Sequence, residues 1–142
     1  GLGIDISEAA IAVARKNAKR LHLSDRANFS TSNWFSTVKN QKFDLIIANP
    51  PYIHPNQLER LSPEVLKEPM IALTDNEDGL GSFRKIAMGA QKFMALGARL
   101  VFEIGYDQGP LVVEILNISG FQDIRVVPDL NGCDRMITCC SK

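Results

Sequence analysis

A nearly continuous apolar segment, Phe43-Asp44-Leu45-Ile46-Ile47-Ala48, runs directly into the turn Asn49-Pro50-Pro51-Tyr52. A run of this kind is typical of a strand that is buried on both faces of a parallel sheet. The strand must end at residue 48, because consecutive prolines neither donate to a sheet ladder nor continue a helix. The chain is therefore predicted to contain a buried parallel strand with a rigid, polar turn at its carboxyl end.

Predicted strands and helices alternate along the rest of the chain. Ser7 caps the first helix, Gly97 ends the second, and Pro110 is tolerated in the first turn of the third. Residues 53–79 read as a long loop with one helical turn near 63–66, and loops of this length are usually functional. The predicted strands are 2–6, 27–31, 43–48, 98–104, 121–127 and 135–140, and the predicted helices are 7–21, 82–96 and 108–118.

This alternation predicts an open α/β sheet that is mostly parallel. The last two strands are joined by residues 128–132, a connection too short for a parallel crossover, so a C-terminal antiparallel hairpin is expected. In such sheets ligands bind at the carboxyl ends of the strands. Asp5, Asn33, Trp34, the turn at 49–52 and Glu103 follow or end predicted strands, so the chemistry is expected among them.

Composition restricts the class of protein. A chain of 142 residues with 45% hydrophobic and 23% charged residues suits one ordinary globular domain. Sixteen basic residues balance sixteen acidic ones, so broad nucleic-acid binding gains no support. No apolar run approaches the ~20 residues that span a bilayer. Cys133, Cys139 and Cys140 lack metal-ligand spacing and suggest reduced thiols in a cytoplasmic protein.

The turn at 49–52 is the sharpest chemical signal. The Asn49 side chain offers one acceptor and two donors, whereas Pro50 keeps only its carbonyl acceptor. Together these two acceptors suit both hydrogens of a substrate –NH₂ group, and the Tyr52 ring suits its flat face. The alternative is a proline-rich turn in which Asn49 caps the backbone locally.

Three other residues each have two possible roles. Asp5 ends the first strand, where an acidic residue accepts hydrogen bonds from ribose hydroxyls or complements a helix dipole. Trp34, beside Asn33, suits a flat ligand such as adenine, although core packing under a loop is the commoner role. Glu103 lies among apolar neighbours and needs a partner, either a ligand or Arg99 or Arg135. No metal site is expected.

Asn-Pro-Pro-Tyr at the end of a strand resembles the catalytic motif of amino-group methyltransferases with the class I S-adenosylmethionine-dependent fold. Further stretches resemble one branch, the HemK/PrmC protein-(glutamine-N5) methyltransferases that act on peptide chain release factors. These stretches are GIDIS (3–7), SNWF (32–35), FDLIIANPPYI (43–53), EP (68–69), EDGL (77–80), FEIGYDQG (102–109) and DLNGCDR (129–135). They follow one another over almost the whole chain.

The resemblance implies a role for each candidate residue. Asp5 would bind the ribose hydroxyls of S-adenosylmethionine, and Asn33 and Trp34 would lie near its adenine. Asn49 would border both cofactor and substrate, and Asn49, Pro50, Pro51 and Tyr52 would hold the glutamine amide. Family members commonly have Asp where this chain has Asn33. The implied function is methylation of the glutamine side-chain amide in class 1 release factors, with no membrane and no direct nucleic-acid partner.

Two alternatives stay open: methylation of an exocyclic base amine of RNA or DNA, and a non-catalytic fragment that binds no cofactor. The resemblance places a first strand and glycine-rich loop before residue 1, so the chain looks like a C-terminal part of the catalytic domain. That strand would lie between strands 2–6 and 43–48, and without it two strand edges would be open. Self-association or rearrangement near residues 1–6 is therefore expected.

Overall fold

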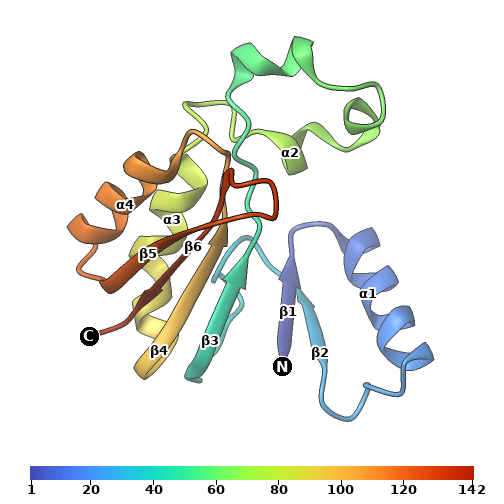
Figure 1. Ribbon diagram of the computed structural model, residues 1–142. Helices are drawn as coiled ribbons and strands as arrows, with labels where there is room; N and C mark the ends of the chain where they lie inside the picture. The colour runs from blue at the N-terminus through green and yellow to red at the C-terminus, as the bar shows by residue number, and fades with distance from the viewer. The chain divides into compact units, whose positions relative to one another are not determined.

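The computed structural model describes residues 1–142, and the chain divides into one unit of residues 1–41 and another of residues 42–142. The first unit is a strand–helix–strand arrangement of β1 (Leu2–Asp5), α1 (Glu8–Arg20) and β2 (Asn28–Thr31) (Figure 1). The two strands are parallel. Ile11 and Ala18, seven positions apart and so on the same side of α1, are its buried residues. Ser7 caps the helix as predicted, because its Oγ accepts the Ala10 N–H at 3.2 Å.

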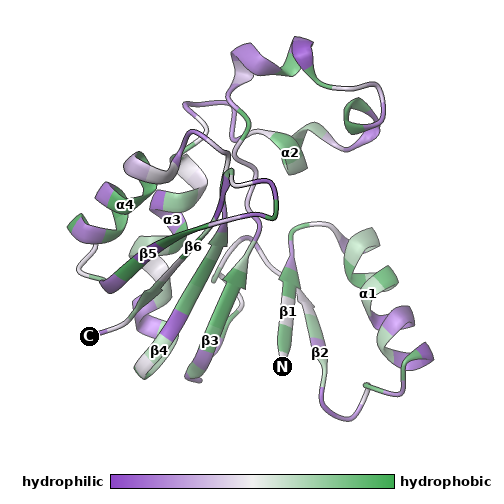
Figure 2. Ribbon diagram, viewed as in Figure 1, coloured by the Kyte–Doolittle hydropathy of each residue, from purple (hydrophilic) through white to green (hydrophobic).

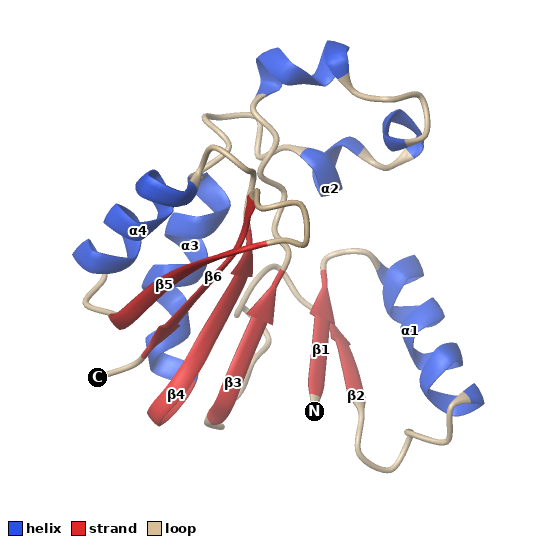
Figure 3. Ribbon diagram, in the orientation of Figure 1, coloured by secondary structure: helices blue, strands red, loops and turns tan.

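The second unit is built on four strands in the order β3 (Phe43–Ala48), β4 (Met94–Glu103), β6 (Asp134–Cys140) and β5 (Gln122–Pro128). β3 and β4 are parallel, while β6 runs antiparallel to both β4 and β5. This confirms the predicted C-terminal antiparallel hairpin. The helices α3 (Gly81–Ala90) and α4 (Gly109–Ile118) lie together on one face of this sheet (Figures 1 and 3).

The core of the second unit lies between this sheet and its two helices. Phe83 of α3 meets Phe102 of β4 edge to face, with ring centroids 5.2 Å apart. Leu100, Leu116 and Ile137 are wholly buried around them. Figure 2 shows the apolar residues concentrated along β3 and β4. Each such side chain stabilises the fold by about 1.5–3 kcal/mol relative to exposure, so the inner strands and helices hold the carboxyl end of β4 in place.

Residues 49–80 lie beyond the carboxyl end of β3 (Figure 3). The predicted loop contains three short helical segments: 3₁₀ turns at Pro55–Arg60 and Val65–Lys67, and α2 (Met70–Leu73). The turn at Val65–Lys67 overlaps the one predicted near 63–66, and the other two were not predicted. No helix in the chain has the length and apolarity needed to span a bilayer.

The prediction that the strand at 43–48 is buried on both faces is wrong. β3 pairs only with β4 and is an edge strand of its sheet. Leu45 and Ile47 are 51% and 70% exposed, whereas Ile46 and Ala48, which pair with Leu100 and Phe102, are partly covered. A continuous apolar run shows that a strand can be covered on both faces, but not which elements cover it.

The prediction of one helix over 82–96 ended by Gly97 is also wrong. α3 ends at Ala90, a 3₁₀ turn follows at Gln91–Phe93, and β4 begins at Met94. Phe93 and Met94 are buried as a helical stripe would require, but they are buried from a turn and a strand. Gly97 lies within β4 with φ of +72°, where the register to β3 shifts. Its freedom to adopt a left-handed conformation allows this irregularity.

Candidate functional site

The turn Asn49-Pro50-Pro51-Tyr52 leaves the carboxyl end of β3, as predicted. The Asn49 side chain is exposed and makes no hydrogen bond within the chain, so its local capping role is not observed. Pro50 is buried and Tyr52 is half-buried. The amide of Asn49 is thus presented to its surroundings by a backbone that two prolines make stiff.

Tyr52 is held at both ends. Its hydroxyl donates to Glu103 Oε1 at 3.1 Å, and its carbonyl oxygen accepts from Gln108 Nε2 at 2.9 Å. Burial raises the pKa of the Tyr52 phenol, and the negative charge of Glu103 raises it further, while Arg135 opposes the shift. The phenol is therefore neutral near pH 7 and acts as a donor to Glu103.

Glu103 has a partner that the sequence did not reveal. Of the partners expected for it, neither Arg99 nor Arg135 forms an ion pair with it; Tyr52 is its hydrogen-bond partner. The Arg135 guanidinium donates to the Ile104 carbonyl at 3.3 Å, and its Nε lies 3.6 Å from Asp129 Oδ2. The end of β4 therefore contributes a carboxylate whose observed contact fixes the Tyr52 ring.

A second loop packs against the turn. Asp75 organises it, because its carboxylate accepts the backbone N–H groups of Glu77, Gly79 and Gly81 at 2.9, 3.1 and 2.7 Å. Gly79 has φ of +74°, and a Cβ there would lie 2.6 Å from the Tyr52 carbonyl oxygen. Only glycine permits this approach.

α2 adds a further support to the same turn. The Ile53 N–H donates to the Leu73 carbonyl at 2.9 Å. The residue that follows Tyr52 is thereby tied to a helix whose last residue, Leu73, is buried. The segment 49–53 is thus held by β4, by α2, by the loop at 75–81 and by the start of α4.

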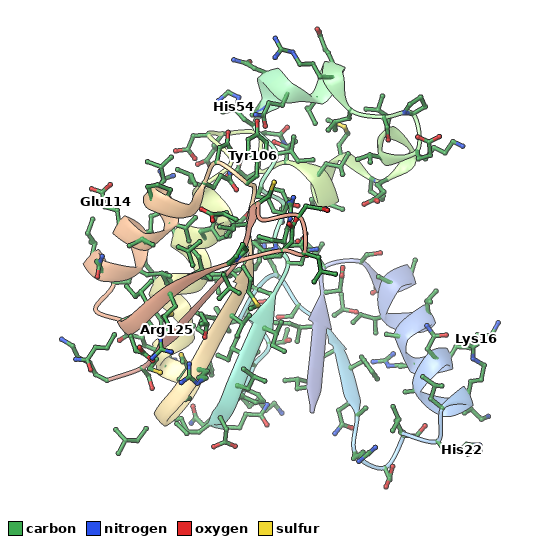
Figure 4. All side chains as sticks on the ribbon, viewed as in Figure 1. Lys16, His22, His54, Tyr106, Glu114 and Arg125 are labelled. Carbon is green, nitrogen blue, oxygen red and sulfur yellow. The ribbon has the colours of Figure 1, made fainter.

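A pocket of about 190 Å³ opens beside this turn. Both apolar and polar side chains line it, among them Leu61 and Gln57. Tyr106, which is labelled in Figure 4, contributes to it from the connection between β4 and α4. The residues that line the pocket are Tyr52, Ile53, Gln57, Leu61, Gly105, Tyr106, Asp107, Gln108 and Arg135.

Three of the four residues assigned to the cofactor, namely Asp5, Asn33 and Trp34, belong to the first unit, and the fourth, Asn49, belongs to the second. Asp5 ends β1, and its carbonyl accepts the Ser32 N–H at 2.8 Å, which joins the carboxyl ends of β1 and β2. Asp5 is exposed, and its Oδ1 accepts the Ser7 N–H at 2.7 Å. Asn33 is exposed beside it. These polar groups lie where ligands bind parallel sheets.

Trp34 is partly buried and has φ of +51°, a left-handed backbone conformation that is uncommon for a bulky residue. Its carbonyl accepts the Ser32 hydroxyl at 2.7 Å, which stabilises this unusual backbone conformation. The structure thus brings Asp5, Asn33 and Trp34 to one edge of the first unit. The turn at 49–52 belongs to the second unit.

Sequence reasoning missed the residues that support the turn. Gln108 and Gly79 lie in the stretches FEIGYDQG and EDGL, which carried the family resemblance but received no role. The sequence signal that could have found them was a polar residue, Gln108, shortly after a predicted strand and a glycine, Gly79, in the loop that follows the turn at 49–52. His22 follows the end of α1, and His54 Nδ1 accepts the Asn56 N–H; neither histidine received a role.

The sequence pattern of the methyltransferase small domain family matches residues 2–78, more than half of the chain. The chain belongs to the methyltransferase small domain family. The match includes Asp5, Asn33, Trp34 and the turn at 49–52, so the residues at both strand ends lie within the family's own pattern.

Relatives of known name extend the comparison. The chain is 42% identical over 139 residues to a release factor glutamine methyltransferase of Cereibacter sphaeroides, covering 97% of this chain and 50% of that protein. It is 43% identical over 134 residues to a bifunctional methyltransferase of Rickettsia felis, covering 94% of this chain and 25% of that protein. The chain thus spans half or less of the length of these two relatives.

Solved structures agree on the fold. A methyltransferase from Pyrococcus furiosus superposes with a TM-score of 0.72 at 14% identity, covering 98% of this chain and 61% of that one. The fold is that of the class I S-adenosylmethionine-dependent methyltransferases, as the resemblance implied.

Proposed function

We propose that this chain carries the catalytic residues of an S-adenosylmethionine-dependent methyltransferase that methylates the side-chain amide nitrogen of glutamine in peptide chain release factors. Relatives about 40% identical over nearly the whole chain bear the name release factor glutamine methyltransferase and support this substrate. A substrate that takes part in translation implies that the protein works in the cytoplasm.

The observation that carries the proposal is the unpartnered Asn49 side chain at the end of β3, next to a Tyr52 ring fixed by Glu103. In the proposed complex the Asn49 side-chain oxygen and the Pro50 carbonyl each accept one hydrogen of the substrate amide. The Tyr52 face lies against the flat carboxamide, which favours an amide over the tetrahedral ammonium of a lysine. These contacts would fix the orientation of the amide and so direct the nitrogen lone pair toward the methyl group.

This orientation answers the chemical difficulty of the reaction. A carboxamide nitrogen is a weak nucleophile, because its lone pair is delocalised into the carbonyl. When bound, S-adenosylmethionine supplies an already activated methyl group. The chain therefore contributes alignment and electrostatic stabilisation. Positive charge would develop on the nitrogen as its bond to the methyl carbon forms and the bond from that carbon to sulfur breaks, so the two acceptors would bind the transition state more strongly than the ground state. One N–H proton would leave to solvent afterwards, which restores a neutral amide.

The first unit has groups that suit the cofactor. The exposed Asp5 carboxylate at the end of β1 is an acceptor for two adjacent ribose hydroxyls, even though one of its oxygens also accepts the Ser7 N–H. Asn33 and the partly buried Trp34 supply an amide and an aromatic face for the adenine. Asp5, Asn33 and Trp34 would hold the adenosine part of the cofactor.

A transfer assay with tritiated S-adenosylmethionine tests the proposal. The complete gene product that contains this chain is incubated separately with a purified class 1 release factor and with total RNA. We expect label in the protein and none in the RNA. Label in RNA alone would show that the substrate is a base amine and not a glutamine amide. Failure to bind S-adenosylmethionine in calorimetry would show that the protein is not a methyltransferase.

A further inference from the structure

Gln108 joins three separate segments of the second unit through its side chain. Its Nε2 donates to the Tyr52 carbonyl at 2.9 Å and to the Gly79 carbonyl at 3.2 Å. Its Oε1 accepts the Gly105 N–H at 2.9 Å. Tyr52 and Gly79 lie 56 and 29 residues away in sequence, so this one amide connects the substrate turn, the loop at 75–81 and the start of α4.

The chemistry of these contacts requires an amide. Two carbonyl oxygens face the nitrogen and one N–H faces the oxygen, so both hydrogens and one oxygen lone pair are used. A carboxylate would set a negative oxygen against two carbonyls, and an aliphatic side chain would leave all three groups without this partner. Backbone bonds fix the residue as well, since the Gln108 N–H donates to Gly105 and its carbonyl accepts from Val112.

We propose that Gln108 is a positioning residue for the methyl transfer, holding the Tyr52 backbone so that the turn at 49–52 presents the substrate amide in line with the methyl group. The proposal rests on the proposed function for its reaction. Gln108 touches neither substrate nor reacting atoms and acts through the Tyr52 carbonyl. The Glu103 contact fixes the ring of Tyr52, whereas Gln108 fixes its main chain.

The substitution Gln108→Glu tests this at nearly constant shape. The introduced carboxylate still accepts the Gly105 N–H but loses both donations, so the start of α4 is kept while the turn is released. We expect kcat to fall about 10- to 100-fold, the scale of a small misplacement of reacting groups. The KM for S-adenosylmethionine should stay within about twofold, because Asp5, Asn33 and Trp34, which would hold its adenosine part, are unchanged. Gln122→Glu, at an exposed position on β5, is the matched control and should leave kcat unchanged.

Hydrogen exchange separates this proposal from the proposed function. In Gln108→Glu we expect faster amide exchange in residues 49–54 and 77–81 and unchanged exchange in β5 and β6. A parent that does not methylate release factor would overturn the proposed function, and the exchange rates would still test the coupling. Parent-like kcat in an active enzyme, or parent-like exchange in residues 49–54, would overturn the positioning role of Gln108.

Discussion

Replacing Gly79 by alanine should damage both stability and turnover, because the loop at 75–81 supports the substrate turn by direct contact. The new Cβ would lie 2.6 Å from the Tyr52 carbonyl oxygen, where ordinary contact begins at 3.4 Å, so one of the two must move by about 0.8 Å. The φ of +74° adds about 1–2 kcal/mol of backbone strain for a residue with a side chain. Overpacking against a backbone atom adds about 1–3 kcal/mol.

Gly132→Ala is the matched control. Its φ of +82° imposes a similar backbone strain, but nothing lies within 4 Å of the added Cβ. In urea denaturation we expect Gly132→Ala to lower the free energy of unfolding by about 1–2 kcal/mol. Gly79→Ala should lose about 1–3 kcal/mol more.

In the methyl-transfer assay only Gly79→Ala should lose kcat, by about 10- to 100-fold, because displacement of the Tyr52 carbonyl misaligns the turn at 49–52. Equal losses of stability in the two variants, together with unchanged turnover in both, would refute the contact between the loop and the turn.

Three further substitutions test other parts of the proposal. Asn49→Ala in the complete gene product should lower the methyl-transfer rate by about 10²-fold or more while release-factor affinity changes little, since it removes an acceptor that stabilises developing charge; near-parent turnover would eliminate the two-acceptor arrangement. Asp5→Ala should weaken S-adenosylmethionine binding by at least about tenfold in calorimetry, as expected for a charge-assisted hydrogen bond. An unchanged affinity would show that Asp5 does not bind the cofactor and only accepts the Ser7 N–H. This 142-residue chain should self-associate in light scattering, because β3 is an edge strand and its Ile47 side chain is 70% exposed. Ile47→Lys should reduce that association, and a monomer at all concentrations would contradict the prediction.

Much of the fold was predictable because its signals are local. Ser7 precedes a helix whose apolar positions recur at helical spacing, and the short connection at 128–132 permits only an antiparallel pair. The position of Asn49 at the end of β3 followed from two prolines that cannot extend the strand. These features depend on neighbouring residues alone.

The errors arose where burial depends on distant segments. Leu45 and Ile47 read as buried, but they alternate with Ile46 and Ala48 and so lie on the face of the sheet opposite α3 and α4, where they are exposed. Phe93 and Met94 suit a helical face and a strand equally, so the end of α3 was misplaced. The partners of Glu103 and Gln108 were hidden for the same reason, because Tyr52 lies 51 and 56 residues away.

The central claim is that the turn at 49–52 directs a methyl group to a glutamine amide. Tandem mass spectrometry of a class 1 release factor, after incubation with S-adenosylmethionine and the complete gene product, locates the added methyl group most directly. The account predicts one added methyl on the side-chain amide nitrogen of a single glutamine, absent with Asn49→Ala. A methyl group on a lysine, on an arginine or on co-purified RNA, with the glutamine unmodified, would contradict it.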